Sequence, residues 1–278
     1  MALSFHQSVI PYSPLQKGIN EQVLLDRNTV PDIKVTVSRI SLHPGASWSI
    51  RASSNEIVWF QVLSGTVVIE DDEKTSELNS HHVVLFPPLA TGVIQSGNGA
   101  TLLYATVPDY KLIDPECFFS EPSLIRILDW SKEPVLQSEH DARKRIYLVT
   151  PTLSGTTAIK GEMIIYPPGT EAANHHHEGA AHFMYILAGK GTCYANEQPF
   201  AVTEGDVVYY EDMERHYLQS DPKTEMRFVE FFVPGKYKTI WAPDANVCAW
   251  LPTGKNILGK KAARHIQAHS SAAPTPDI

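Results

Sequence analysis

The sequence predicts an all-β fold made of two tandem β-barrels, and three observations support this prediction. Short runs rich in β-branched and aromatic residues recur about every 8–12 residues, each bounded by Gly, Pro, Asn or Asp. Helical periodicity is nearly absent. The second half of the chain also repeats the spacing of the first half. These features are typical of a barrel or sandwich unit that occurs twice.

The first barrel is predicted over residues 1–110 and the second over residues 146–255. The strand-like runs of the first half are 33–42, 56–65, 66–71, 82–88 and 101–107. Those of the second half are 161–169, 182–191, 205–212 and 226–235. Val, Ile, Phe and Tyr dominate these runs, and such residues favour a half-buried pleated strand.

The chain outside the two barrels differs in composition. Residues 111–145 are polar, with prolines at positions 115, 122 and 134, which predicts a linker with room for a short helix. Residues 256–278 end rich in Ala, Ser and Pro, which predicts a flexible tail.

The internal repeat is visible when the chain is compared with itself at an offset of 124 residues. At this offset Gly45 coincides with Gly169, and Gly65 coincides with Gly189. The segments that end in the last two glycines, VLSG and ILAG, then share one register. A nearly gapless register over about 50 residues indicates two copies of one barrel unit.

Composition and charge narrow the class of protein. The formal net charge is −8 and basic runs are missing, which disfavours nucleic acid as a partner. No apolar run approaches the roughly 18 residues of a membrane span, and the N-terminus lacks the pattern of a signal peptide. Three well-separated cysteines suit reduced thiols. We therefore expect a cytoplasmic protein with a small-molecule substrate, and its strand edges and aromatic stretch 239–252 are compatible with a homodimer.

Histidines cluster in the second half of the chain. His175, His176 and His177 are consecutive, and His182 follows closely. Residues two apart in a strand share a face, so His175 and His177 are expected to point together while His176 points away. A hairpin would bring His182 back beside this pair, and His216 would arrive from another strand. Imidazoles that converge in an apolar cavity favour a metal such as Fe, Cu, Ni or Zn, and a solvated polar loop is the alternative.

The spacing of these residues resembles the first motif of the cupin family. That motif reads Gly, five residues, His-x-His, three or four residues, Glu, six residues, Gly. Here Gly169 precedes His175 and His177 at these distances, and His182 precedes Gly189. One residue departs from the pattern, because His182 stands where the family usually has Glu.

A second, degenerate motif completes the resemblance. It reads Gly, five residues, Pro-x-Gly, two residues, His, and its ends are Gly205 and His216. Glu211 and Met213 replace the usual Pro and Gly. The resemblance implies two tandem jelly-roll barrels, that is, a bicupin. The implied metal ligands are His175, His177, His182 and His216.

The first barrel lacks this set of ligands. The positions that match the four histidines are Arg51, Ser53, Val58 and Gly92. The turn glycines and the hydrophobic strands remain. We therefore expect a structural N-terminal barrel without metal and a metal site only in the C-terminal barrel.

The ligand type points to a class of chemistry. Four neutral imidazoles leave the charge of a divalent ion uncompensated, which favours an anionic or enolisable substrate. The set resembles that of cupin dioxygenases acting on diketones, flavonols and aromatic acids, so an oxidoreductase with Fe(II) is the leading hypothesis, and Cu, Ni, Mn and Zn are the other candidate metals. The alternatives are redox-neutral chemistry (aminohydrolase, lyase, isomerase or decarboxylase) and a metal- or ligand-binding barrel without turnover.

Glu230 is the candidate catalytic residue. It lies in the run RFVEFFV on one face with Phe228 and Phe232, an apolar setting that suits a general base. Pairing with Arg227 at a barrel edge is the alternative. Glu178, next to the histidine triplet, is expected to be solvent-exposed. The two alternatives are that it supports a metal ligand from outside the coordination sphere or that it binds the metal itself.

Overall fold

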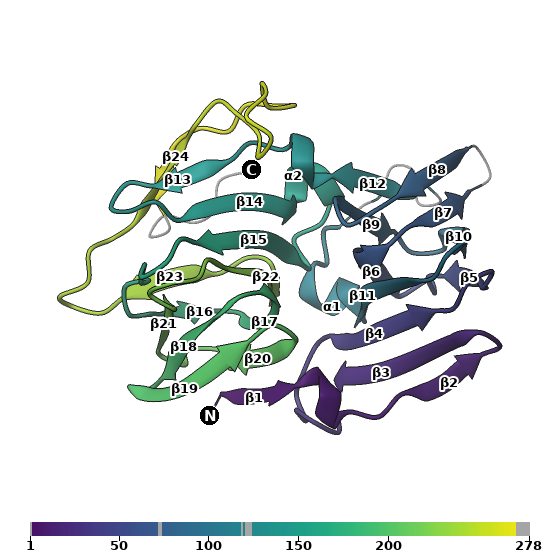
Figure 1. Cartoon of the computed structure of the whole chain (residues 1–278), viewed down its shortest axis with the longest axis horizontal. Coiled ribbons are helices and arrows are strands. Elements are labelled where there is room, and N and C mark those ends of the chain that lie inside the picture. The colour runs from purple at the N-terminus through teal and green to yellow at the C-terminus, as the bar shows by residue number, and fades with distance from the viewer. Residues whose placement is uncertain (1, 72–73, 118, 120–123, 271–278) are drawn as a thin grey trace. The chain divides into compact units, whose positions relative to one another are not determined.

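The computed structural model describes residues 2–71, 74–117, 119 and 124–270. The fold is all-β, as predicted, and the chain divides into two compact units (Figure 1). The N-terminal unit is Ser8–Trp130, and the C-terminal unit combines Ser131–Ile278 with Met1–Gln7. No helix among the described residues has the length and apolar character needed to cross a membrane.

The N-terminal unit consists of two antiparallel sheets. Their strand orders are β12-β9-β6-β11-β4-β3-β2 and β5-β10-β7-β8. The strands are β2 (Ser13–Gln16), β3 (Ile19–Leu25), β4 (Thr36–Leu42), β5 (Ser47–Arg51), β6 (Glu56–Gly65), β7 (Val67–Glu70), β8 (Thr75–Leu78), β9 (His82–Phe86), β10 (Thr91–Gln95), β11 (Ala100–Pro108) and β12 (Arg126–Asp129). A one-turn helix, α1 (Tyr110–Ile113), follows β11. Inward-facing Val58, Phe60 and Phe86 are fully buried in a core that both sheets share.

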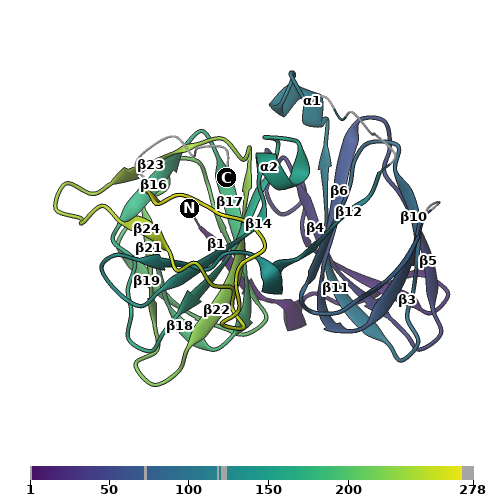
Figure 2. The same cartoon turned by 90° about the horizontal axis from the view of Figure 1, so that it is seen from above.

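The C-terminal unit is built in the same way. Its sheets have the orders β1-β20-β17-β22-β15-β14-β13-β24-β25 and β19-β18-β21-β16-β23. The strands of the larger sheet are β1 (Leu3–His6), β13 (Leu136–Ser138), β14 (Lys144–Val149), β15 (Lys160–Tyr166), β17 (Ala181–Ala188), β20 (Asp206–Tyr210), β22 (Met226–Val233), β24 (Ala249–Pro252) and β25 (His269–Ser270). Those of the smaller sheet are β16 (His175–Glu178), β18 (Lys190–Ala195), β19 (Gln198–Thr203), β21 (His216–Ser220) and β23 (Lys238–Trp241). Its helix is α2 (Pro151–Ser154), and the 3-10 turns η1 (Gln7–Val9) and η2 (Trp130–Lys132) lie where the chain passes from one unit to the other. Figure 2 shows the strands of this unit around its interior.

The two units share a strand order, which agrees with the sequence repeat. The run β9-β6-β11-β4-β3-β2 in one corresponds to β20-β17-β22-β15-β14-β13 in the other. Gly65 and Gly189 end equivalent strands with positive φ angles of 75° and 79°. A Cβ at either glycine would collide with a backbone carbonyl, of Gly99 and Glu225 respectively. Both positions therefore require glycine.

The unit boundaries differ from the expected ranges at three places. Residues 1–7 were expected in the N-terminal barrel, but β1 pairs with β20 of the C-terminal unit and covers the edge of that strand. Residues 111–145 were expected to form a linker, but β12 pairs with β9, and β13 and the start of β14 belong to the larger C-terminal sheet. Residues 256–278 were expected to be a flexible tail, but β25 within this range pairs with β24. Residues 271–278 lie outside the described part of the chain.

Candidate metal site

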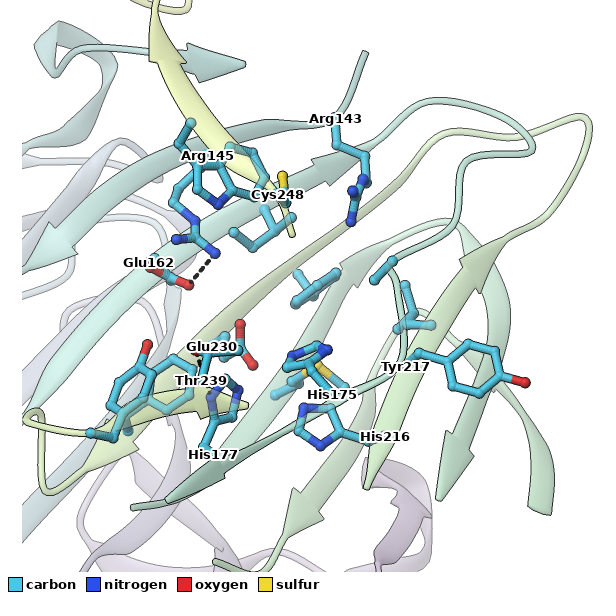
Figure 3. Close-up of a pocket in the computed structure, with 18 of the residues that line it drawn as sticks. Arg143, Arg145, Glu162, His175, His177, His216, Tyr217, Glu230, Thr239 and Cys248 are labelled. Carbon is cyan, nitrogen blue, oxygen red and sulfur yellow. Dashed lines mark hydrogen bonds and ion pairs between the residues drawn. The ribbon is translucent and has the colours of Figure 1, made fainter. Parts of the chain in front are cut away.

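The histidines of the C-terminal unit come from facing sheets. His175 and His177 alternate with His176 along β16, and His175 is the cross-strand partner of His216 on β21. His182 lies on β17 in the larger sheet, beside Phe232 of β22. Strand alternation and barrel closure therefore place the four imidazoles at one point of the interior (Figure 3 shows three of them, His175, His177 and His216).

The four imidazole rings form one cluster, in which each ring contacts at least two others. The ring of His216 lies with its centroid 4.4 Å from that of His175, 5.2 Å from that of His177 and 4.7 Å from that of His182. The rings of His177 and His182 are 5.0 Å apart. Nitrogen atoms of His175, His177 and His216 all lie within 4.8 Å of one another. His182 joins His177 and the carboxylate of Glu230 in a second group of this size.

Hydrogen bonds orient the rings. His175 Nδ1 lies 2.8 Å from the carbonyl oxygen of Ala173, and His216 Nδ1 lies 2.8 Å from that of Glu214. A carbonyl only accepts, so each Nδ1 donates and each Nε2 keeps a lone pair. The Nε2 atom of His216 is buried with no hydrogen-bond partner among the described residues. An orphaned acceptor of this kind fits a metal ion.

Burial keeps these imidazoles neutral. It lowers the pKa of His175 to about 3. For His177, His182 and His216, burial and the neighbouring imidazoles hold the pKa well below its usual range. Neutral imidazole is the form that binds Fe, Cu, Ni and Zn. The donor set and its protonation state therefore both suit a divalent transition metal.

Glu230 lies beside the imidazoles, on β22. Its Oε1 atom is 3.2 Å from His182 Nε2, and its side chain is largely buried. Burial, together with the charge of Glu162, raises the pKa of Glu230 to about 8. Arg227, the ion-pair partner of Glu230 that the sequence left open, pairs with a different carboxylate. Its Nε atom lies 3.4 Å from Oε1 of Glu225.

The neighbours of the histidine triplet lie apart from this centre. His176 is on the opposite face of β16, 3.5 Å from the carboxylate of Glu178. The Glu178 side chain is 45% exposed, in line with the expectation of solvent exposure.

A cavity of about 80 Å³ opens beside the histidines. Its wall includes His175, His177, His216 and Glu230 on one side and Arg143 and Arg145 on another (Figure 3). The segment that follows β23 also reaches the wall through Cys248 and Trp250. The Arg145 guanidinium lies 4.2 Å from the ring centroid of Trp250.

A buried ion network forms the charged part of this wall. Glu162 is paired with Arg145 at 3.1 Å and with Lys160 at 3.5 Å, and the side chains of Lys160 and Glu162 are only 3% and 1% exposed. Lys160 also donates a hydrogen bond to Tyr237 Oη at 2.9 Å. One carboxylate thus lies between two cations, which gives this wall a positive character.

These wall residues were not identified from the sequence. Arg143 and Arg145 fall in the range assigned to a linker. A signal was nevertheless present, because Lys160 and Glu162 interrupt an otherwise apolar buried strand two residues apart. Charged residues at alternate positions of a buried strand require partners inside the barrel.

In the N-terminal unit, the equivalent positions carry no such cluster. Arg51 and Ser53 are exposed, and Val58 is part of the core. Within the described ranges, both groups of His, Cys, Asp and Glu side chains close enough to hold a metal lie in the C-terminal unit.

Comparison with known proteins gives a family for this region. Residues 162–232 match the family described as Cupin domain. An oxalate-binding protein from Thermotoga maritima is 30% identical over 67 residues, which are 24% of this chain and 55% of that protein. The match thus spans little more than half the length of this relative.

Solved structures are similar over most of the chain. A mutant of Bacillus subtilis oxalate decarboxylase has a TM-score of 0.68 at 16% identity, over 86% of this chain and 78% of that one. Protein Ylba from E. coli has a TM-score of 0.67 at 11% identity, over 84% and 90% of the two chains. At these identities the similarity shows the fold alone. The region that holds the four histidines and Glu230 therefore matches the Cupin domain, and the chain shares its all-β fold with proteins of cupin-like jelly-roll architecture.

Proposed function

We propose that the C-terminal barrel is the active site of a metal-dependent enzyme that acts on a small carboxylate without net oxidation, as a decarboxylase or another lyase does. The observation that carries this proposal is one cavity that has a cationic wall and is lined by His175, His177 and His216, with His182 in contact with the last two rings. His175, His177, His182 and His216 would hold the ion, a divalent transition metal. The names of the similar proteins, an oxalate-binding protein and an oxalate decarboxylase, support a carboxylate as ligand.

The residues around the cavity would have different roles in this reaction. When bound, a divalent ion supplies Lewis acidity to a coordinated carboxylate. Arg143 and Arg145 attract and orient the anion from the opposite wall. Glu230 is placed to hold a proton next to the reacting carbon, so that a proton replaces the carbon dioxide that leaves. The aromatic side chains around the cavity exclude water from this exchange.

A dioxygenase reaction is the second candidate, and the donor set favours it. Four protein ligands leave two positions of an octahedral ion, enough for a substrate and dioxygen. Oxygen dependence separates the two proposals.

The test uses the metal-loaded full chain with a panel of small mono- and dicarboxylates, with and without oxygen. Carbon-13 NMR follows the products, and a His177→Ala variant serves as the control with a broken donor set. We expect equal product formation in both atmospheres and none with His177→Ala. Product that requires oxygen would establish the dioxygenase reaction, and no turnover of any carboxylate would contradict both.

A further inference from the structure

The cavity has an apolar layer next to the layer that carries the chemistry. On β15, Ile164 follows Glu162 by two residues, and on β21, Leu218 follows His216 by two residues. Because residues two apart in a strand share a face, each strand presents first a polar group and then an apolar one to the interior. All four side chains line the cavity.

The other two strands repeat this arrangement. On β22, Phe228 lies two residues from Glu230, and on β17, Met184 lies two residues from His182. Phe228 is the cross-strand partner of Ile164, which joins the two strands into one apolar surface. Two residues of a strand span about 7 Å, so the apolar layer begins within the reach of a short ligand.

The apolar layer is closed to solvent. Ile164, Met184, Leu218 and Phe228 are each at most 4% exposed. A cavity of 80 Å³ has room for roughly five to eight water-sized atoms. A ligand of this size with its carboxylate at the histidines brings its other atoms to the layer that holds these apolar side chains and, on the adjacent strand β14, Arg145.

From this arrangement we infer that the site takes a short-chain aliphatic monocarboxylate, of about the size of butyrate, in preference to acetate. This inference rests on the proposed function. Acetate has no methylene group to place against the apolar layer and therefore gains less from it. An alkyl chain at the same place loses its contact with water, which stabilises the complex.

Calorimetric titration of the metal-loaded full chain with acetate, propionate and butyrate tests this inference. Each added methylene should lower the Kd roughly fourfold. An Ile164→Thr variant should lose most of the gain from acetate to butyrate while its affinity for acetate stays within about twofold. Leu258→Asn, at a side chain that is 57% exposed outside the cavity, is the matched control and should behave as wild type.

The outcomes separate the inference from the function. Metal content and circular dichroism confirm that each variant is folded. Binding of acetate with no gain along the series from acetate to butyrate would overturn the inference and leave the proposed function standing. Failure of every carboxylate to bind would contradict the proposed function itself, and the inference with it.

Discussion

The charged side chains that line the cavity of the C-terminal barrel have identifiable ion-pair partners, and its buried imidazoles have an identifiable reason to be neutral. The imidazoles are neutral because burial disfavours their protonated form. Glu162 is different, since Arg145 and Lys160 both depend on it. Two buried cations that share one carboxylate make that carboxylate the most sensitive point of the wall.

Removal of the Glu162 charge should therefore destabilise the protein. A Glu162→Gln variant leaves Arg145 and Lys160 buried without their shared ion-pair partner, at a cost of about 3–5 kcal/mol in the free energy of unfolding. Urea titration followed by circular dichroism measures this difference. The control is Glu225→Gln, whose ion pair with Arg227 is about half exposed and should contribute less than about 1 kcal/mol. An equally small loss from both variants would contradict the account of the wall.

Glu230 gives a prediction for the pH dependence of stability in metal-free protein. Its pKa is about 8 in the folded state against an ordinary value of 4.5. Between these values the unfolded state has lost the proton while the folded state retains it, so a rise in pH favours unfolding. Relative to Glu230→Gln, which does not titrate, wild type should lose up to about 1.4 kcal/mol of stability per pH unit from pH 5 to pH 8. Denaturant titrations of both proteins across this range measure the difference, and a constant difference would refute the raised pKa.

At the scale of elements, the sequence allowed prediction of strand type and of which histidines share a face. The alternation in β16 separates His176 from His175 and His177, and the structure shows this separation. Pairing between distant segments was beyond the sequence. Nothing in the sequence of β1 identifies β20 as its partner. The pairing depends on where the folded sheet leaves an uncovered edge, and local sequence does not specify this.

The charged wall was missed for a related reason. Prolines and polar residues dominate the segment before β14, so local composition indicated a linker. Arg145 on β14 forms its ion pair with Glu162 on the adjacent strand β15. Only the register between these two strands brings the two side chains together. Local sequence predicts an element more readily than its partner.

Deletion of residues 1–6 should loosen β20. This strand pairs with β1 on one side and with β17, which carries His182, on the other. Without β1, its outer amides lose their partners, and hydrogen exchange in β20 should accelerate at least tenfold. Exchange in β22, which is paired on both sides by β15 and β17, is the internal control. Unchanged protection of β20 would show that β1 contributes nothing to this edge.

At the scale of the molecule, one strand order is used twice with different interiors. The N-terminal unit fills its barrel with residues such as Val58, Phe60 and Phe86. The C-terminal unit places His182 where Val58 stands in the repeat, and it has a cavity beside its histidines. The same backbone therefore supports a packed core in one copy and a candidate metal site in the other. Function resides in the side chains of the site rather than in the fold.

The proposed function requires that the four histidines bind one divalent transition metal per chain. Elemental analysis of purified wild type, His182→Ala and His176→Ala, each reconstituted with a single metal and then desalted, measures this binding. We expect about one ion per chain in wild type and in His176→Ala, and a loss of at least tenfold in metal affinity in His182→Ala. Absence of metal from wild type, or equal loss in both variants, would contradict the site.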